Sequence, residues 1–343
     1  ADAETTYTEQ EHLDYILSDQ SISQNYAAER VGFDAMLHTP TLAQHDDVFV
    51  VRPNNDTLYS LGAYGLEEGY VEMTLPQTDR YQSVMIYDAE HYIADGGVFV
   101  NETGKIVIVK AGNPVPDIEG SVVTVETDVV GIVVRTMVRS ADDLEAARKI
   151  QQSMEVVKVG GTTRTEPMPV PLSKEKYLEM RKYYAAREGD IPFGELFQYR
   201  SNRISNRLIA QGVFEGAGAL TKDQAQYKSI FTDTNDRKLV GRNAYTLTVP
   251  SSIPVKHFWS VTVYNEDGNL VANDARIYNI NSESGVRNSD GDTVVNFGSC
   301  ETRTVVNCIP TGEGDWNFLW RYYGPEGEIA DNTWDHIRPE IAN

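Results

Sequence analysis

The densest group of polar side chains in the sequence is the stretch RPNNDTLYS, at residues 52–60. An arginine, a carboxylate and a phenol at this spacing can bind a sugar or a carboxylated small molecule. A partly buried Asp56 can also share a proton with Tyr59 or the ligand. The alternative is a plain turn, because Asn and Asp side chains hydrogen-bond to their own backbone. The functional interpretation predicts Asp56 and Tyr59 as catalytic residues, and as ligand-binding residues Arg52, Asn54 and Asn55.

A second group lies in the strand-like stretch KHFWSVTVY, at residues 256–264. Side chains alternate between the two faces of a strand, so Trp259 and Tyr264 take opposite faces. We predict ligand contacts for both, with a core position as the alternative for Trp259. Arg276 and Arg321 also lie in strand-like segments, where they can clamp an anionic ligand or form structural ion pairs. We predict both arginines as ligand-binding residues.

The common catalytic and cofactor motifs do not occur in the sequence. It has no GxSxG elbow, no P-loop, no HExxH and no GxGxxG between a strand and a helix. The six histidines include no pair at metal-ligand spacing, so we expect no cofactor and no metal site. The spacing of Cys300 and Cys308 suits a disulfide across neighbouring strands, and two buried free thiols are the alternative.

The composition limits the class of partner. In 343 residues there are 30 Lys and Arg against 51 Asp and Glu, a formal net charge of -21 at pH 7. A nucleic-acid binder needs a basic face, so we expect no nucleic-acid partner. Because no run of about 18 apolar residues occurs, we expect no membrane insertion. A start without Met and a disulfide candidate favour a periplasmic or secreted protein, and a homo-oligomer stays open.

These residues need a β-rich scaffold to position them. Segments rich in β-branched and aromatic residues, separated by turn residues, predict strands across 48–138 and 243–323. One helix is predicted to begin at Ser140. Four other helices are predicted at Glu9–Leu37, Ser173–Arg187, Phe193–Gln211 and Thr221–Phe231. The predicted fold class is mainly β with helical segments (α+β), as two β-sandwich or jelly-roll-like modules linked by a helical middle.

Several of these stretches together resemble a known family. RPNNDTLYS, VMIYD at 84–88 and the pair Arg135-Thr136 resemble domain of unknown function 1254. FWSVTVY at 258–264, followed by Arg276 and Arg321, is similar to its usual companion, domain of unknown function 1214. The resemblance implies two β modules with helices between them, often exported from bacteria, and an activity that is not settled. It divides the chain into an N-terminal module at 1–160, a helical connecting region at 161–235 and a C-terminal module at 236–343.

Three functions are compatible with these features. The first is a cofactor-free hydrolase or acid–base enzyme that acts on a polar small molecule or saccharide in the groove between the modules. The second is a non-catalytic envelope or extracellular protein that binds a carbohydrate or another small ligand on its 19 tyrosines and 4 tryptophans. The third is a structural or interaction module. The density of polar residues in strand-like segments favours the enzyme.

Overall fold

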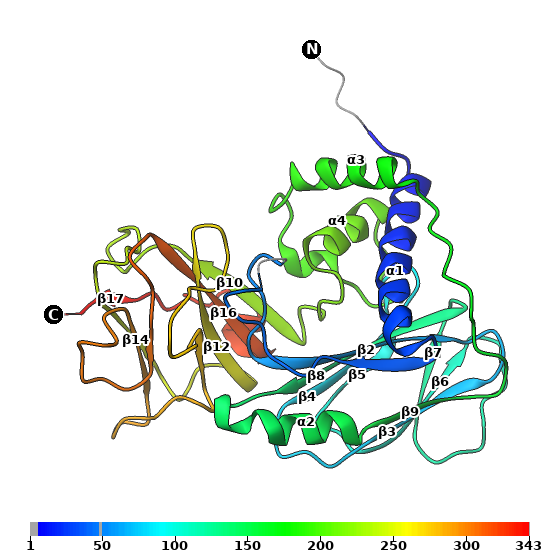
Figure 1. The fold of residues 1–343 in the computed structure, drawn as a ribbon, viewed down its shortest axis with the longest axis horizontal. Helices are drawn as coiled ribbons and strands as arrows, with labels where there is room; N and C mark the ends of the chain where they lie inside the picture. Colours follow the sequence, from blue (N-terminus) through cyan, green and yellow to red (C-terminus); the bar gives the residue numbers. More distant parts are fainter. Residues whose placement is uncertain (1–5, 48–49, 343) are drawn as a thin grey trace. The chain divides into compact units, whose positions relative to one another are not determined.

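The computed structural model describes residues 6–47 and 50–342 of the chain (Figure 1). Residues 48 and 49, at the start of the first predicted strand region, lie outside the described residues. Contacts divide the chain into two compact units. Unit 1 comprises Ala1–Pro40, Leu58–Thr136 and Ala146–Lys222, and unit 2 comprises Thr41–Thr57, Met137–Glu145 and Asp223–Asn343.

Unit 1 is built on two sheets packed face to face. The first sheet has the order β1 (Ala35–His38), β2 (Thr57–Gly65), β8 (Val129–Met137), β4 (Gln82–Asp88), β5 (Ile93–Val100). The second has the order β7 (Ser121–Val125), β6 (Gly104–Lys110), β3 (Tyr70–Leu75), β9 (Glu155–Val159). Alternate side chains of both sheets form one buried core. The remaining side chains of the first sheet therefore point to its other face.

Two helices of unit 1, α1 (Glu9–Val31) and α4 (Asn206–Gly216), lie over that other face of the first sheet, and α3 (Lys174–Ala185) packs on both of them (Figure 1). The helix α2 (Leu144–Ser153) precedes β9. A capping box fixes the start of α1, because the Thr8 hydroxyl accepts the N–H of Glu11 and the Glu11 carboxylate accepts the N–H of Thr8. Tyr15, Tyr184 and Ile209 belong to the core that joins these helices.

Unit 2 contains two further sheets with their own core. One has the order β10 (Ala225–Ile230), β16 (Trp316–Pro325), β12 (Val255–Asn265), β13 (Asn279–Asn281). The other has the order β15 (Cys308–Ile309), β14 (Thr293–Phe297), β11 (Tyr245–Val249), β17 (Glu340–Ile341), and α5 (Gly327–Ala330) follows β16. Trp259, Trp316 and Trp320 lie in the core of this unit. Cys300 and Cys308 form a disulfide, with their Cα atoms 5.7 Å apart.

The predicted fold class is confirmed, because the chain is mainly β with helical segments and has two β-rich modules. The helix predicted at Thr221–Phe231 is wrong. This segment forms β10, which pairs with β16 from Ala225↔Tyr323 to Ile230↔Phe318, so tertiary pairing overrides local propensity. The helix predicted at Phe193–Gln211 is a short 3₁₀ turn at Phe193–Leu196 followed by α4. The three-part division of the chain stays a prediction.

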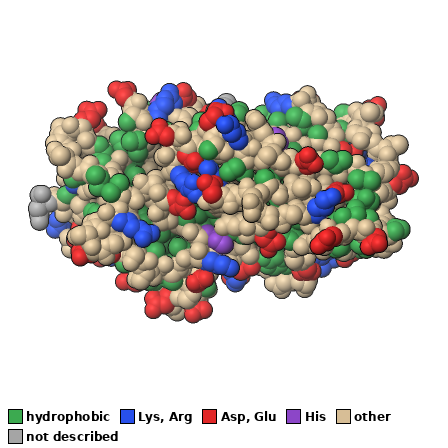
Figure 2. Space-filling view, turned by 90° about the horizontal axis from the view of Figure 1, so that it is seen from below, with side chains coloured by type: hydrophobic (Ala, Val, Ile, Leu, Met, Phe, Trp, Pro, Cys, Tyr) green, Lys and Arg blue, Asp and Glu red, His purple; other side chains and the backbone are tan. Residues whose placement is uncertain are grey.

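The described residues carry charges of both signs on their surface. On the face shown in Figure 2, the basic side chains of the described residues lie beside acidic ones and form no continuous basic area. Across residues 6–47 and 50–342, no helix has both the length and the apolar character needed to cross a bilayer.

Candidate functional site

Asp56 lies in unit 2 and is completely buried, with 0% of its surface exposed. Its Oδ2 accepts hydrogen bonds from Ser260 Oγ at 2.6 Å and from Tyr323 OH at 2.9 Å, and its Oδ1 accepts one from Asn279 Nδ2 at 2.7 Å. Burial raises the pKa of Asp56, while the charge of Arg321 and these three donors oppose the rise. Both carboxylate oxygens are therefore occupied by protein donors.

The residues before Asp56 are tied into the same buried cluster. Asn54 Oδ1 accepts the N–H of Asp56 at 2.7 Å, and Asn54 Nδ2 donates to Tyr323 OH at 3.0 Å. Asn55 Nδ2 donates to Ala43 O at 2.6 Å. The first of these bonds is the Asx turn that the sequence offered as the alternative to a pocket. We call Asn54, Asp56, Ser260, Asn279 and Tyr323 the Asp56 network.

Two residues predicted from the C-terminal part also reach this segment. Arg321 Nη2 donates to Arg52 O at 3.1 Å, and its Nη1 donates to Thr262 Oγ1 at 3.1 Å. Tyr264 OH donates to Pro53 O at 2.8 Å. Unit 2 thus brings together six predicted residues: Arg52, Asn54, Asn55, Asp56, Tyr264 and Arg321. Their contacts are with one another's backbone and with buried side chains, an arrangement that anchors the segment.

Two other predicted ligand-binding residues lie apart from the Asp56 network. Trp259 is 3% exposed and packs edge-on against Trp320 within the core, so little of its indole surface is open to a ligand. Arg276 is exposed, and its Nη1 lies 3.2 Å from Asp46 Oδ1 and 3.0 Å from Gln44 Oε1. We place neither residue in the candidate site.

Tyr59, the second predicted catalytic residue, belongs to unit 1 and points away from the sandwich core. On the strands β2, β4 and β8, the core-facing side chains include Tyr64, Val84, Ile86, Ile132 and Val134. Alternation therefore turns Tyr59, Tyr87 and Arg135 towards the face that carries the helices. Gln151 of α2 holds the strand here, because its Nε2 donates to Tyr59 O at 3.0 Å. The guanidinium carbon of Arg135 lies 5.5 Å from the centre of the Tyr59 ring.

Tyr87 is seated on a glycine of the neighbouring strand. A methyl group added at Gly131 would lie 2.3 Å from Cζ of Tyr87, so the phenol ring occupies the space that any side chain at position 131 would need. Burial, reinforced by the nearby charge of Asp19, raises the pKa of Tyr87 to about 12, and Arg135 opposes this. The carboxylate of Asp19 and the guanidinium of Arg135 therefore act on the pKa of this phenol in opposite directions.

Asp19 comes from α1 and is partly exposed to solvent. Its Oδ1 accepts a hydrogen bond from Tyr177 OH of α3 at 2.6 Å. Burial raises the pKa of Asp19, while the bond from Tyr177 and the charge of Arg181 oppose the rise. The pKa of Asp19 therefore lies above that of an ordinary aspartate, and part of the residue's surface is exposed. We call Asp19, Tyr59, Tyr87 and Arg135 the helix-face group.

A buried histidine borders the helix-face group. His91 is 1% exposed, and its ring centre lies 5.1 Å from that of Tyr87. Its Nε2 accepts the N–H of Gly218 at 2.8 Å, so the proton of the neutral imidazole sits on Nδ1. That Nδ1 has no hydrogen-bond partner among the described residues. Burial lowers the pKa of His91 to about 4, and Arg135 Nη2 donates to the carbonyl of the same Gly218.

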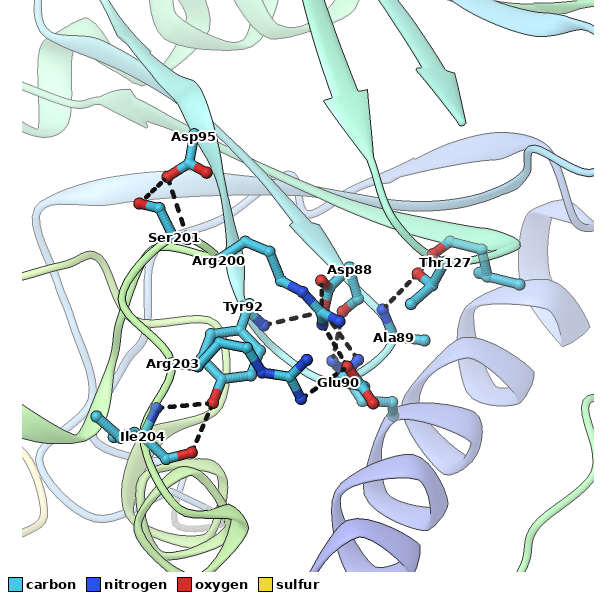
Figure 3. A network of polar contacts seen from close by, with 12 residues as sticks. Asp88, Ala89, Glu90, Tyr92, Asp95, Thr127, Arg200, Ser201, Arg203 and Ile204 are labelled. Carbon is cyan, nitrogen blue, oxygen red and sulfur yellow. Dashed lines mark hydrogen bonds and ion pairs between the residues drawn. The ribbon is translucent and has the colours of Figure 1, made fainter. Parts of the chain in front are cut away.

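A polar network holds the turn that presents His91 (Figure 3). Asp88 Oδ1 accepts the N–H groups of Glu90 at 2.9 Å and Tyr92 at 3.1 Å, and its backbone oxygen accepts the N–H of His91. Arg200 Nη1 lies 3.0 Å from Asp88 Oδ2 and also pairs with Glu90. These bonds hold His91 at φ 64°, a conformation that few residues other than glycine adopt without support.

The helix-face group combines three chemical capacities. Arg135 supplies a permanent positive charge, Tyr87 supplies a phenol that stays protonated at neutral pH, and Asp19 supplies a carboxyl group with a raised pKa. Sequence reasoning selected only Tyr59 as a site residue from this group. Among the described residues, no cluster of three or more His, Cys, Asp and Glu could hold a metal ion.

Comparisons with known proteins identify the family. Residues 33–158 match the family described as protein of unknown function (DUF1254), and residues 224–327 match protein of unknown function (DUF1214), in the order that the resemblance predicted. No curated protein matches the sequence.

Two solved structures share the fold. The VPA0106 protein from Vibrio parahaemolyticus is 16% identical with a TM-score of 0.73, covering 98% of this chain and 100% of that chain. A putative uncharacterized protein from Burkholderia cenocepacia is 14% identical with a TM-score of 0.55, covering 96% of this chain and 86% of that chain. At these identities the likeness concerns the fold alone.

Proposed function

We propose that this chain, which carries the two-domain arrangement of DUF1254 followed by DUF1214, is an acid–base enzyme. Its substrate is a small polar molecule bound at the helix-face group of unit 1. The observation that carries this proposal is the placing of Tyr59, Tyr87 and Arg135 on one face of the sheet, with Tyr87 seated on Gly131, Arg135 over the Tyr59 ring, and burial together with the charge of Asp19 raising the pKa of Tyr87. Perturbed titratable groups gather at functional sites more often than elsewhere.

Each residue of the group has a distinct role in the proposed reaction. Arg135 binds a carboxylate or another anionic group of the substrate. Asp19 accepts a proton from the substrate, or from a water molecule that attacks an ester or glycosidic bond, and returns it later. Tyr87 donates a hydrogen bond to the oxygen on which negative charge develops. Tyr59 closes the binding surface beside Arg135.

The test is a comparison of turnover between matched variants of α1. A polar metabolite and oligosaccharide extract is incubated with the unmodified protein, with Asp19→Asn and with Glu29→Gln, and the products are measured by mass spectrometry. Glu29 is an exposed carboxylate on the same helix. We expect a substrate to be consumed by the unmodified protein and by Glu29→Gln, and at least 100-fold more slowly by Asp19→Asn, as for a lost general base. Full turnover by Asp19→Asn would contradict the role of Asp19.

Ligand binding without turnover is the competing proposal. It is supported by Tyr87 and His91, which both stay neutral at pH 7 and can serve as binding groups rather than as proton carriers. In the same experiment, a compound that co-purifies with the protein and returns unchanged would favour binding. Export to an oxidising compartment is a further proposal, supported by the disulfide between Cys300 and Cys308, and cell fractionation of the native host checks it.

A further inference from the structure

A pocket of about 410 Å³ lies in unit 1, away from the helix-face group. It is bounded by the end of β2, the turn after it and the segment 162–168. The residues lining it include Asp34, Glu67, Glu68, Asp128, Lys158 and Glu166. Its volume falls within the range of small-molecule sites in proteins. None of its lining residues belongs to the helix-face group.

A buried ion pair between Asp34 and Lys158 lies in the lining of the pocket and forms what we call its floor. One carboxylate oxygen of Asp34 accepts no hydrogen bond from the described residues. The side chains of Asp34 and Lys158 are only 6% and 10% exposed, and Lys158 Nζ lies 3.6 Å from Asp34 Oδ2. Asp34 Oδ1 accepts the N–H of Gly65 at 2.8 Å, whereas Oδ2 has no hydrogen-bond partner among the described residues. A buried carboxylate oxygen without a donor is costly, and a ligand that donates to it would remove the cost.

The segment 162–168 forms the roof of the pocket, and hydrogen bonds hold it at both ends. Lys158 Nζ donates to Thr162 O at 3.0 Å, where the roof segment begins. At its other end, Asn25 of α1 exchanges two hydrogen bonds with Met168, from Nδ2 to Met168 O at 3.0 Å and from Met168 N to Oδ1 at 2.7 Å. The pocket is therefore held open by side-chain contacts, a form of preorganisation that favours binding.

The excess of negative charge in the lining favours a positively charged ligand. Five carboxylates and only two cationic side chains line the pocket. Of these carboxylates, Asp34 is paired with Lys158 in the lining and Asp128 with Lys110 outside it. Three threonines, at positions 162, 163 and 165, add hydroxyl groups. We propose that this pocket binds a small organic amine, whose ammonium group pairs with the carboxylates at the rim and whose remaining donors reach the floor. This inference does not depend on the proposed enzyme activity.

Calorimetric titration at low ionic strength tests the proposal. The probes are spermidine and glucosamine, which carry the ammonium group on two different skeletons, with glucose and glucuronate as neutral and anionic comparisons. We expect saturable binding of at least one amine and weaker or no binding of glucose and glucuronate. If both amines fail to bind at millimolar concentration, or if glucose or glucuronate binds as tightly as they do, the proposal is wrong.

Matched variants place the amine in the pocket. Glu68→Gln and Glu166→Gln each remove an exposed rim carboxylate and should weaken amine binding about two- to fivefold, as for partly solvated ion pairs. Glu175→Gln removes an exposed carboxylate of α3 outside the lining and should leave the affinity unchanged. Equal affinity in all three variants would place the amine elsewhere and overturn the assignment.

Discussion

The Asp56 network and the helix-face group contain the same kinds of side chain. They differ in how many hydrogen bonds from the protein their aspartate accepts. Each has an aspartate whose pKa is raised by burial, with an arginine and tyrosines nearby. Asp56 is fully buried and accepts three side-chain hydrogen bonds, whereas Asp19 is partly exposed and accepts one, from Tyr177. A carboxylate can act on a substrate only where an oxygen is not already filled by the protein. The difference supports the proposal that Asp56 anchors its segment and that Asp19 takes part in the chemistry.

The largest expected effect is the loss of stability when the closed network is broken. Asp56→Ala leaves the donors of Ser260, Asn279 and Tyr323 buried without an acceptor, and should lower the free energy of unfolding by about 3–5 kcal/mol. Asp19→Ala should lower it by about 1 kcal/mol or less, because water can replace the carboxylate. Denaturant unfolding of both variants measures the difference.

Variants of Asp56 and Asp19 can also contradict the distinction between an anchoring and a reactive aspartate. Similar losses of stability in Asp56→Ala and Asp19→Ala would remove the distinction between a closed and an open carboxylate. A folded Asp56→Asn that loses all turnover would restore the catalytic role predicted for Asp56 from the sequence.

Acid should act in opposite senses on the buried histidine His91 and on the buried aspartates. His91 has a folded pKa of about 4, below its unfolded value, so the unfolded state binds the proton first and stability falls from pH 6.5 towards pH 4. Asp56 and Asp88 have raised folded pKa values, so their contributions are kept at low pH and lost as the pH rises; for Asp88 this happens through about pH 6.

His91→Asn isolates the effect of acid on the turn, since asparagine tolerates the positive φ better than most residues. Relative to the unmodified protein, this variant should gain about 3 kcal/mol of stability as the pH falls from 6.5 to 4. Denaturant unfolding at several pH values measures the gain. A constant difference between the two proteins across this range would show that His91 is not held neutral.

A change of packing within the helix-face group should lower stability by less than the loss of Asp56. Gly131→Ala places a methyl group against the ring of Tyr87 and should cost about 1–3 kcal/mol of stability, together with most of the proposed turnover. Gly314→Ala is the matched control, because a methyl group there meets nothing within 4 Å. If Gly131→Ala retained full turnover, the position of Tyr87 would be irrelevant to the reaction.

The sequence predicted part of this arrangement for physical reasons. Alternation and turn residues are sufficient to predict the β-rich fold. In the stretch at 52–60 the structure contains the Asx turn that was the alternative to a pocket, and Asp56 also accepts a hydrogen bond from Asn279. Asp19 gave no signal, because one carboxylate on a helix resembles any other until its neighbours in space are known. Gly131, in the middle of an otherwise β-branched strand, did mark a close approach, and that signal could have led to Tyr87.

The Asp56 network also sets an order of events during synthesis. Asp56 leaves the ribosome before Ser260 by 204 residues and before Tyr323 by 267. At bacterial and eukaryotic elongation rates, the buried carboxylate therefore waits on the order of 10–50 s for its donors. During that time the segment from Thr41 to Thr57 has no sheet of unit 2 to join, although the strand that follows it can already enter unit 1. Unit 2 is thus completed only after β16 has been translated, and a ribosome that stalls before β16 leaves the RPNNDTLYS segment open to chaperones and proteases.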